Sequence, residues 1–208
     1  MTEVILVRHA ATSWSGQRFC GWSDPPLSAA GHRAAVGLAR SLAGELSPRT
    51  RVITSPSLRA RTTADEIVAA AGLDPPTVDE RWMEAHFGDV EGRSFEDVEL
   101  AYPAISARIL AADIAIDWPG GETIDAFVAR VASACSELAA AQVPDQVLVV
   151  SHAGPIRLAL AVGGEPGGAA IAPPQPASVV RIDSVALAAG ASGWGLGDHV
   201  LSGGGWTP

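Results

Sequence analysis

Val4-Ile5-Leu6-Val7-Arg8-His9-Ala10, near the start of the chain, is the stretch that decides the fold. Its four consecutive apolar residues, most of them β-branched, predict a strand that is buried on both faces. The run ends abruptly in Arg8 and His9. In an open parallel sheet, ligands bind just beyond the carboxyl ends of the strands. The stretch therefore favours a ligand site at the end of a central strand, although a strand that simply exits into solvent would show the same residues.

Val147-Leu148-Val149-Val150-Ser151-His152-Ala153-Gly154 repeats this design, with an apolar strand that ends in a histidine before a Gly-Pro turn. A third strand, Arg51-Val52-Ile53-Thr54, runs into a helix that begins near Pro56 or Ser57 and carries Arg59 in its first turns. Arginine forks and helix N-termini both suit an anion. Together the three strand ends predict a phosphate site that contains histidines.

Four segments resemble motifs of the histidine phosphatase superfamily, also called the phosphoglycerate mutase-like family. Arg8-His9-Ala10 is similar to the family's Arg-His-Gly, and residues 57–64 are similar to its Ser-x-x-Arg-Ala-x-x-Thr-Ala. Residues 84–92 resemble Glu-x-x-Phe-Gly-x-x-Glu-Gly, and Ser151-His152-Ala153 resembles Ser-His-Gly. Each match alone is weak, but four in the family's order are highly specific.

The resemblance implies an α/β fold, a three-layer α/β/α sandwich around a mostly parallel sheet, in one histidine phosphatase domain over residues 1–208. The alternation of strands and helices along the chain favours the same architecture. Ser28 and Thr123 are the expected N-caps of two helices. Residues 179–182 predict a strand near the end of the chain, with residues 184–189 as a candidate partner strand.

The resemblance also implies the roles of five catalytic residues. His9 would be the nucleophile that accepts the phosphoryl group, and Arg8 and Arg59 would clamp the non-bridging oxygens. His152 would donate a further hydrogen bond to the phosphate. Glu84 matches the family's acid, which gives a proton to the leaving alkoxide.

The predicted phosphate- and substrate-binding set contains Arg8, Arg59 and His152 together with four further positions. These four are Ser15, Cys20, Gly21 and Ala153. In the common pattern glycine follows each histidine, whereas Ala10 and Ala153 follow them here. Alanine fits if the backbone avoids positive φ.

Each of these residues also has a plainer interpretation. Arg8 or Arg59 could form a structural salt bridge, and His152 could cap a helix. Glu84 has acidic neighbours in a charged stretch of little periodicity, residues 75–92, which could be a solvated loop; they are Glu80, Asp89 and Glu91. His86 could line a substrate pocket or be structural.

The function that follows is a metal-independent phosphatase that hydrolyses small phosphate monoesters through a phosphohistidine. Trp118-Pro119-Gly120-Gly121-Glu122 and residues 87–92 look most like α-ribazole phosphatases, and broad-specificity members share them. The alternatives are a cofactor-dependent phosphoglycerate mutase and a catalytically silent phospho-ligand binding module. The segment between Glu84 and His152 looks short for a mutase and lacks its Lys and paired Arg, which disfavours that alternative.

Aromatic side chains are expected around the mouth of the site, with few cations beyond the phosphate clamp. They are Trp14, Trp22, His86, Phe87 and Trp118. Such a lining favours a ligand with one phosphate and a neutral, partly flat body over a compact polyanion.

Composition sets the remaining expectations. The 208 residues are 48% hydrophobic and carry a net charge of -9, which argues against nucleic acid as a partner. The chain shows no membrane span and no signal peptide, and Cys20 and Cys135 are far apart, so we expect a cytoplasmic protein. The five histidines lack metal-ligand spacing, so we expect no metal and no other cofactor. The quaternary state stays open, with a homodimer among the alternatives.

Overall fold

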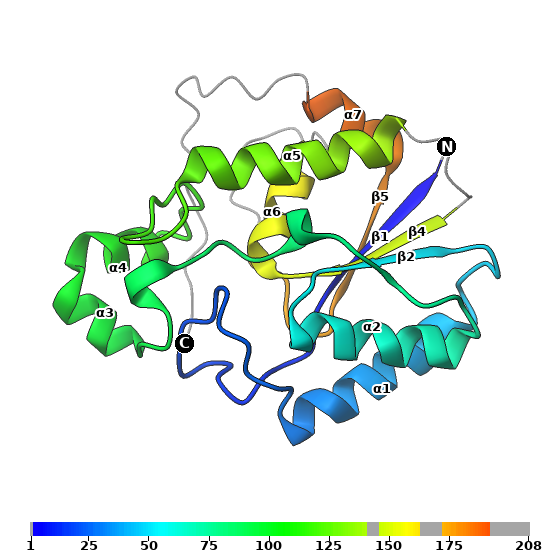
Figure 1. Cartoon of the computed structure of the whole chain (residues 1–208), viewed down its shortest axis with the longest axis horizontal. Coiled ribbons are helices and arrows are strands. Elements are labelled where there is room, and N and C mark those ends of the chain that lie inside the picture. Colours follow the sequence, from blue (N-terminus) through cyan, green and yellow to red (C-terminus); the bar gives the residue numbers. More distant parts are fainter. Residues whose placement is uncertain (1, 141–145, 163–171, 192–208) are drawn as a thin grey trace.

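The computed structural model describes residues 2–140, 146–162 and 172–191, and its centre is a five-stranded sheet in the order β3-β2-β4-β1-β5. The strands are β1 (Glu3–Arg8), β2 (Arg51–Thr54), β3 (Thr77–Val78), β4 (Gln146–Ser151) and β5 (Val179–Asp183). The first four run parallel to their neighbours, and β5 is antiparallel to β1 at one edge. The expected mostly parallel sheet is therefore confirmed (Figure 1).

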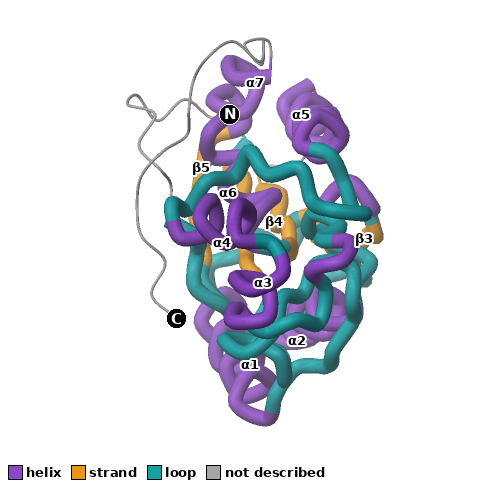
Figure 2. The backbone as a smooth tube through the Cα atoms, turned by 90° about the vertical axis from the view of Figure 1, so that its left-hand side faces the viewer, coloured by secondary structure: helices purple, strands orange, loops and turns teal. Residues whose placement is uncertain are grey.

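Helices cover both faces of this sheet, as expected for a three-layer sandwich. On one face lie α1 (Ala29–Ala43) and α2 (Leu58–Ala71), and on the other lie α5 (Ile124–Ala140), α6 (Ala153–Val162) and α7 (Ser184–Ala191) (Figure 1). The hairpin of α3 (Phe95–Ala101) and α4 (Pro103–Leu110) lies at one end of the molecule, which faces the viewer in Figure 2. Two short 3-10 helices, η1 (Glu80–Trp82) and η2 (Gly88–Val90), precede this hairpin. No helix within the described residues is long and apolar enough to cross a bilayer.

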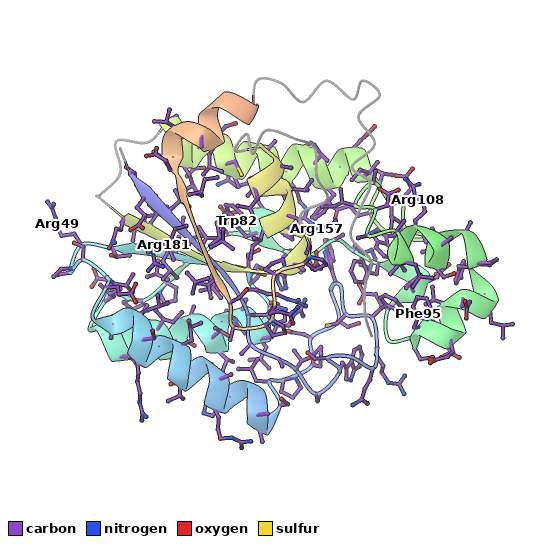
Figure 3. All side chains as sticks on the ribbon, turned by 180° about the vertical axis from the view of Figure 1, so that it is seen from behind. Arg49, Trp82, Phe95, Arg108, Arg157 and Arg181 are labelled. Atoms are coloured by element: carbon purple, nitrogen blue, oxygen red, sulfur yellow. The ribbon has the colours of Figure 1, made fainter. Side chains whose placement is uncertain are left out.

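Alternating side chains of β1 and β4 divide the core into two clusters, because successive residues of a strand point to opposite faces. Ile5 and Val7 pack with residues of α1 and α2. Val4 and Leu6 pack with residues of α5, α6 and α7 and with Trp82, which lies in the interior on that side (Figure 3). These four strand side chains are fully buried. The central strands therefore form a rigid base for the residues that follow them.

The predicted N-caps are confirmed. The Ser28 side chain accepts a hydrogen bond from the backbone N–H of Gly31, and Thr123 Oγ1 accepts one from Ala126 N at 3.3 Å. Both satisfy N–H groups that the first turn of a helix leaves without partners.

Two features of the fold differ from the sequence-based expectations. Residues 184–189 belong to helix α7, so the predicted partner strand is wrong. Asp183 Oδ1 accepts a hydrogen bond from Val185 N at 2.8 Å at the start of this helix, and alanine, the residue with the highest helix propensity, is common in it. The sequence gives no signal for β3, because two residues are too short to show periodicity.

Candidate active site

The ends of β1 and β4 bring the two predicted histidines together. Arg8 pairs with Ser151 in the parallel register, so His9 and His152 each follow a paired residue. His9 N donates to Ser151 O at 2.9 Å, which extends the ladder by one bond. The two ring centroids lie 4.9 Å apart at an interplanar angle of 61°. The structure thus places both imidazoles side by side at the carboxyl edge of the sheet.

The backbone orients the buried ring of His9. Its Nδ1 lies 2.8 Å from Ala10 O, and a carbonyl oxygen only accepts, so Nδ1 carries the hydrogen and Nε2 keeps its lone pair. Burial, together with Arg59 and Arg8, lowers the pKa of His9 well below its ordinary value of 6.5. At neutral pH His9 is therefore a neutral imidazole, which is the form that a nucleophile requires.

His152 is fully buried and has protein partners at both ring nitrogens. Arg59 Nη2 lies 3.2 Å from Nδ1. Because a guanidinium only donates, Nδ1 accepts, and Nε2 carries the hydrogen and donates to Ser55 Oγ at 2.8 Å. Burial, followed by Arg59 and His9, lowers the pKa of His152 well below 6.5. Since Ser55 engages Nε2, the hydrogen bond from His152 to a phosphate stays a prediction.

Arg59 is only 1% exposed and is held by the loop that precedes α1. Its Nη1 donates to Ser23 O at 2.7 Å, and its Nη2 donates to Gly21 O at 2.6 Å. In the same loop, Asp24 accepts hydrogen bonds from Leu58 N at 2.8 and 2.9 Å and so caps helix α2. One loop therefore fixes both the start of α2 and the guanidinium that α2 carries.

Arg8 approaches the same region from β1. Its Nη1 donates to Pro174 O at 2.6 Å, so the segment before β5 holds this guanidinium. Burial lowers the pKa of Arg8, the Glu84 carboxylate raises it and Arg59 lowers it, and all three groups are thus within electrostatic range. Among the described residues, Arg8 Nε and Arg59 Nε are buried donors without a hydrogen-bond partner. Burying an unpaired donor costs about 1–3 kcal/mol.

Glu84 is a buried carboxyl in the irregular segment between η1 and η2. Ala85 N donates to its Oε1 at 3.1 Å, and Gly154 N donates to its Oε2 at 3.3 Å. A Cβ atom at Gly154 would lie 2.2 Å from Glu84 Oε1, so this approach requires glycine. The first turn of α6, directly after His152, therefore holds the carboxyl of Glu84.

The four other predicted substrate-binding residues lie in the loop after β1 and at the start of α6. Ser15 is exposed, and its Oγ accepts a backbone N–H within its own turn at 2.9 Å. Cys20 donates to a backbone carbonyl at 3.2 Å, and burial raises its pKa to about 11, so the thiol is neutral. Gly21 supplies a carbonyl to Arg59, and Ala153 is the first residue of α6. Substrate contacts of these four residues stay predictions.

Alanine is compatible with both motif positions at which the family commonly has glycine. The described non-glycine residues with positive φ are Ala112 and Ala177, and neither Ala10 nor Ala153 is among them. The departures from the glycine pattern therefore introduce no backbone strain.

Comparison with known proteins agrees with this geometry. The sequence profile of the Histidine phosphatase superfamily (branch 1) matches residues 4–185. The chain belongs to this family. The family expected from the motifs is thus confirmed.

Relatives and solved structures in this histidine phosphatase family carry several names. A bifunctional protein of Mycobacterium tuberculosis is 34% identical over 167 residues, covering 80% of this chain but only 45% of that protein. Phosphoserine phosphatase 1 of Hydrogenobacter thermophilus is 33% identical over 158 residues, 76% of this chain and 74% of its own length. The structure of a mycobacterial glucosyl-3-phosphoglycerate phosphatase with VO3 is similar with a TM-score of 0.76 and 26% identity, covering 88% of this chain and 91% of the other.

Glu91 of the histidine phosphatase motif has a role that sequence reasoning missed. It accepts hydrogen bonds from Trp22 N at 2.6 Å, from Ser23 N at 2.5 Å and from Phe87 N at 3.3 Å. Burial raises the pKa of Glu91, but hydrogen bonds from Ser23, Trp22 and Phe87 outweigh it, so the pKa lies below its ordinary value. This carboxylate joins the loop that holds Arg59 to the segment that carries Glu84. The signal in the sequence that could have indicated this role is the place of Glu91 in the family motif over residues 84–92.

Arg157 on α6 is a second residue that the sequence did not single out. Its Nη2 donates to Ala112 O at 2.5 Å. Burial lowers the pKa of Arg157, whereas Glu84 and Asp113 raise it, so Arg157 adds positive charge near Glu84. Figure 3 shows it toward the α3–α4 end of the molecule, away from Arg181.

Proposed function

We propose that this histidine phosphatase hydrolyses small phosphate monoesters through a phosphohistidine at His9. The observation that carries the proposal is the neutral imidazole of His9, which lies beside His152 at the carboxyl edge of the sheet and within electrostatic range of the Arg8 and Arg59 guanidinium groups. Guanidinium donors match the oxygens of a phosphate, and neutral imidazole is a nucleophile. The relatives named as phosphatases support the same reaction class.

Two displacements at phosphorus complete the reaction. In the first, the Nε2 lone pair of His9 bonds to phosphorus while the bond to the leaving oxygen breaks. The leaving oxygen keeps that electron pair and takes a proton from Glu84. In the second, a water oxygen bonds to phosphorus as the N–P bond breaks, and the water proton returns to Glu84. Arg8 and Arg59 stabilise the charge on the non-bridging oxygens in both steps.

The aromatic edge beside Glu84 favours a leaving group that contains a ring. The Trp22 side chain is 48% exposed, its Nε1 donates to Glu84 O at 3.0 Å, and its ring centroid lies 4.7 Å from that of His86. Phe87 and Trp118 contact each other at 4.2 Å and pack against the core. An exposed indole next to the proton donor suits a flat, neutral leaving group. α-Ribazole phosphate is one monoester of this class.

The arginines that could bind a second anionic group, as a mutase requires, have partners of their own. Arg18 donates to Gly92 O at 2.6 Å, and Arg93 donates to Asp89 O at 2.6 Å. Arg81 pairs with Asp79 at 2.7 Å and with Glu137 at 2.6 Å. We therefore expect negligible phosphoglycerate mutase activity.

A panel of monophosphates assayed with the 208-residue chain tests this function. Within the described residues, no group of three or more His, Cys, Asp or Glu side chains is arranged to hold a metal ion. Each assay is therefore run with and without a chelator, to test whether turnover is independent of metal. We expect turnover that survives the chelator, and a higher kcat/KM for nucleotide-like and aryl monophosphates than for 3-phosphoglycerate. A mutase rate with 2,3-bisphosphoglycerate above the rate on every monoester would contradict the proposal. Binding of phosphate esters without any turnover would indicate a silent binding module.

A further inference from the structure

Arg130 on α5 uses all five of its N–H groups around the segment that carries Glu84. Its Nη1 donates to Arg81 O at 2.9 Å and to Met83 O at 2.6 Å, and its Nη2 donates to Glu84 O at 2.8 Å. The other two N–H groups form a fork on the Glu122 carboxylate, with Nε to Oε1 at 2.7 Å and Nη2 to Oε2 at 2.8 Å. A fork of this kind fixes the orientation of both side chains.

Glu122 holds the other side of the same segment. Its Oε2 accepts a hydrogen bond from His86 N at 3.3 Å, and its backbone N–H donates to His86 O at 2.9 Å. The backbone is therefore held at Glu84 itself and on both sides of it. The side chains of Arg130 and Glu122 are 18% and 12% exposed, so solvent competes little with these contacts.

Phe127 and Gly154 continue this arrangement to the carboxyl of Glu84. The Arg130 guanidinium lies over the Phe127 ring, 4.8 Å from its centroid. The tip of Phe127 would lie 2.9 Å from a Cβ atom at Gly154, and Gly154 N donates to Glu84 Oε2. Helix α5 thus holds the backbone of the proton donor, while α6 holds its carboxyl.

No ladder of backbone hydrogen bonds supports this part of the chain, because Glu84 lies in neither a helix nor a strand. The position of its backbone therefore depends on the side-chain contacts of Arg130, Glu122 and Trp22. We propose that Arg130 and Glu122 are positioning residues that hold Glu84 for proton donation to the leaving oxygen. The inference rests on the proposed function, in which Glu84 is the general acid. Displacing a catalytic group by about 1 Å can cost about 10²-fold in rate.

Dependence of the rate on the leaving group separates this role from a purely structural one. A nitrophenolate leaves readily as an anion, whereas an alkoxide requires a proton from the general acid. Arg130→Met and Glu122→Gln should each lower kcat/KM for an alkyl monophosphate by about 10–100-fold, and for p-nitrophenyl phosphate by less than about 3-fold. Glu84→Gln should show the same selectivity. In the Glu84→Gln background, Arg130→Met should cause little further loss.

Arg181→Met is the matched control, because it breaks an arginine ion pair with Glu3 at 3.2 Å on β1 and β5, away from the site. It should leave the ratio of the two rates unchanged. Thermal unfolding shows whether each variant folds. If Arg130→Met does not fold, the milder Glu122→Gln is used for the comparison of the two substrates. If the wild-type protein is active, two results would overturn the positioning role. One is an equal loss of kcat/KM on both substrates, and the other is a loss in Arg130→Met that adds fully to the loss in Glu84→Gln. Absence of turnover in the wild type would instead overturn the proposed function, and this inference with it.

Discussion

Lowering the pH from 7.5 to 5.5 should destabilise the folded chain through His9 and His152. Both rings are buried beside Arg59, and burial holds the pKa of each well below 6.5. In the unfolded chain the same residues titrate near 6.5 and take up protons across this range. The unfolded state then binds more protons than the folded state, so the free energy of unfolding falls as the pH falls.

The size of the effect follows from the titration of the unfolded chain. With a pKa near 6.5, each unfolded histidine goes from about one-tenth to about nine-tenths protonated between pH 7.5 and pH 5.5. Each therefore lowers the free energy of unfolding by up to about 1.4 kcal/mol, and the pair by up to about 2.7 kcal/mol. Above this range both histidines are neutral in both states and contribute nothing. Most carboxyl groups titrate below it.

Urea denaturation at a series of pH values measures the effect. His9→Gln and His152→Gln should each remove about half of the pH-dependent loss, because glutamine does not titrate. His32→Gln, which removes an exposed histidine of α1, is the matched control and should keep the part of the loss that comes from His9 and His152. For each protein, the free energy of unfolding at pH 5.5 is compared with that of the same protein at pH 7.5. The destabilisation caused by the substitution itself therefore cancels. The same loss in His9→Gln as in the wild type would refute the reasoning.

Three further substitutions test the surroundings of the site. Arg59→Lys should lower kcat/KM by about 10²-fold or more, because one ammonium cannot reproduce a fork with several fixed acceptors; a fully active variant would contradict the clamp. Gly21→Ala should reduce kcat/KM more than it reduces the melting temperature, since its Cβ would lie 2.5 Å from Ala85 O and displace the carbonyl that holds Arg59; unchanged kinetics would count against this. Ser28→Ala should lower the free energy of unfolding by about 1 kcal/mol through loss of the helix cap, with kcat/KM unchanged; urea denaturation and steady-state kinetics check both parts.

The position of the two histidines was predictable from the sequence for a physical reason. Buried parallel strands show as continuous apolar runs, and the carboxyl ends of adjacent strands must lie at one edge of the sheet. Arg8, His9 and His152 follow directly from that pattern, and Arg59 follows from the helix after the third strand. Glu84 needed the family motifs, because nothing in the local periodicity brings it to the same edge.

The contacts that orient these groups could not be predicted. Arg8 is held by a carbonyl 166 residues away, at Pro174, and Glu91 joins two loops that are 68 residues apart. Such contacts join irregular segments, which show no periodicity, so the sequence does not indicate which carbonyl or carboxylate meets which donor. The Arg130–Glu122 pair was missed for a related reason. In the sequence, Arg130 is a polar residue of a helix and Glu122 is the end of a turn, and neither pattern indicates that the two side chains meet.

Rapid-quench labelling of His9 is the most direct test of the proposed mechanism. The wild-type protein is mixed with a monoester labelled in its phosphate, quenched within one turnover and digested to locate the label. We expect a base-stable, acid-labile phosphoenzyme with the label on His9, and none in a folded His9→Ala variant. Label on a serine, or a phosphoenzyme that persists in His9→Ala, would contradict the mechanism.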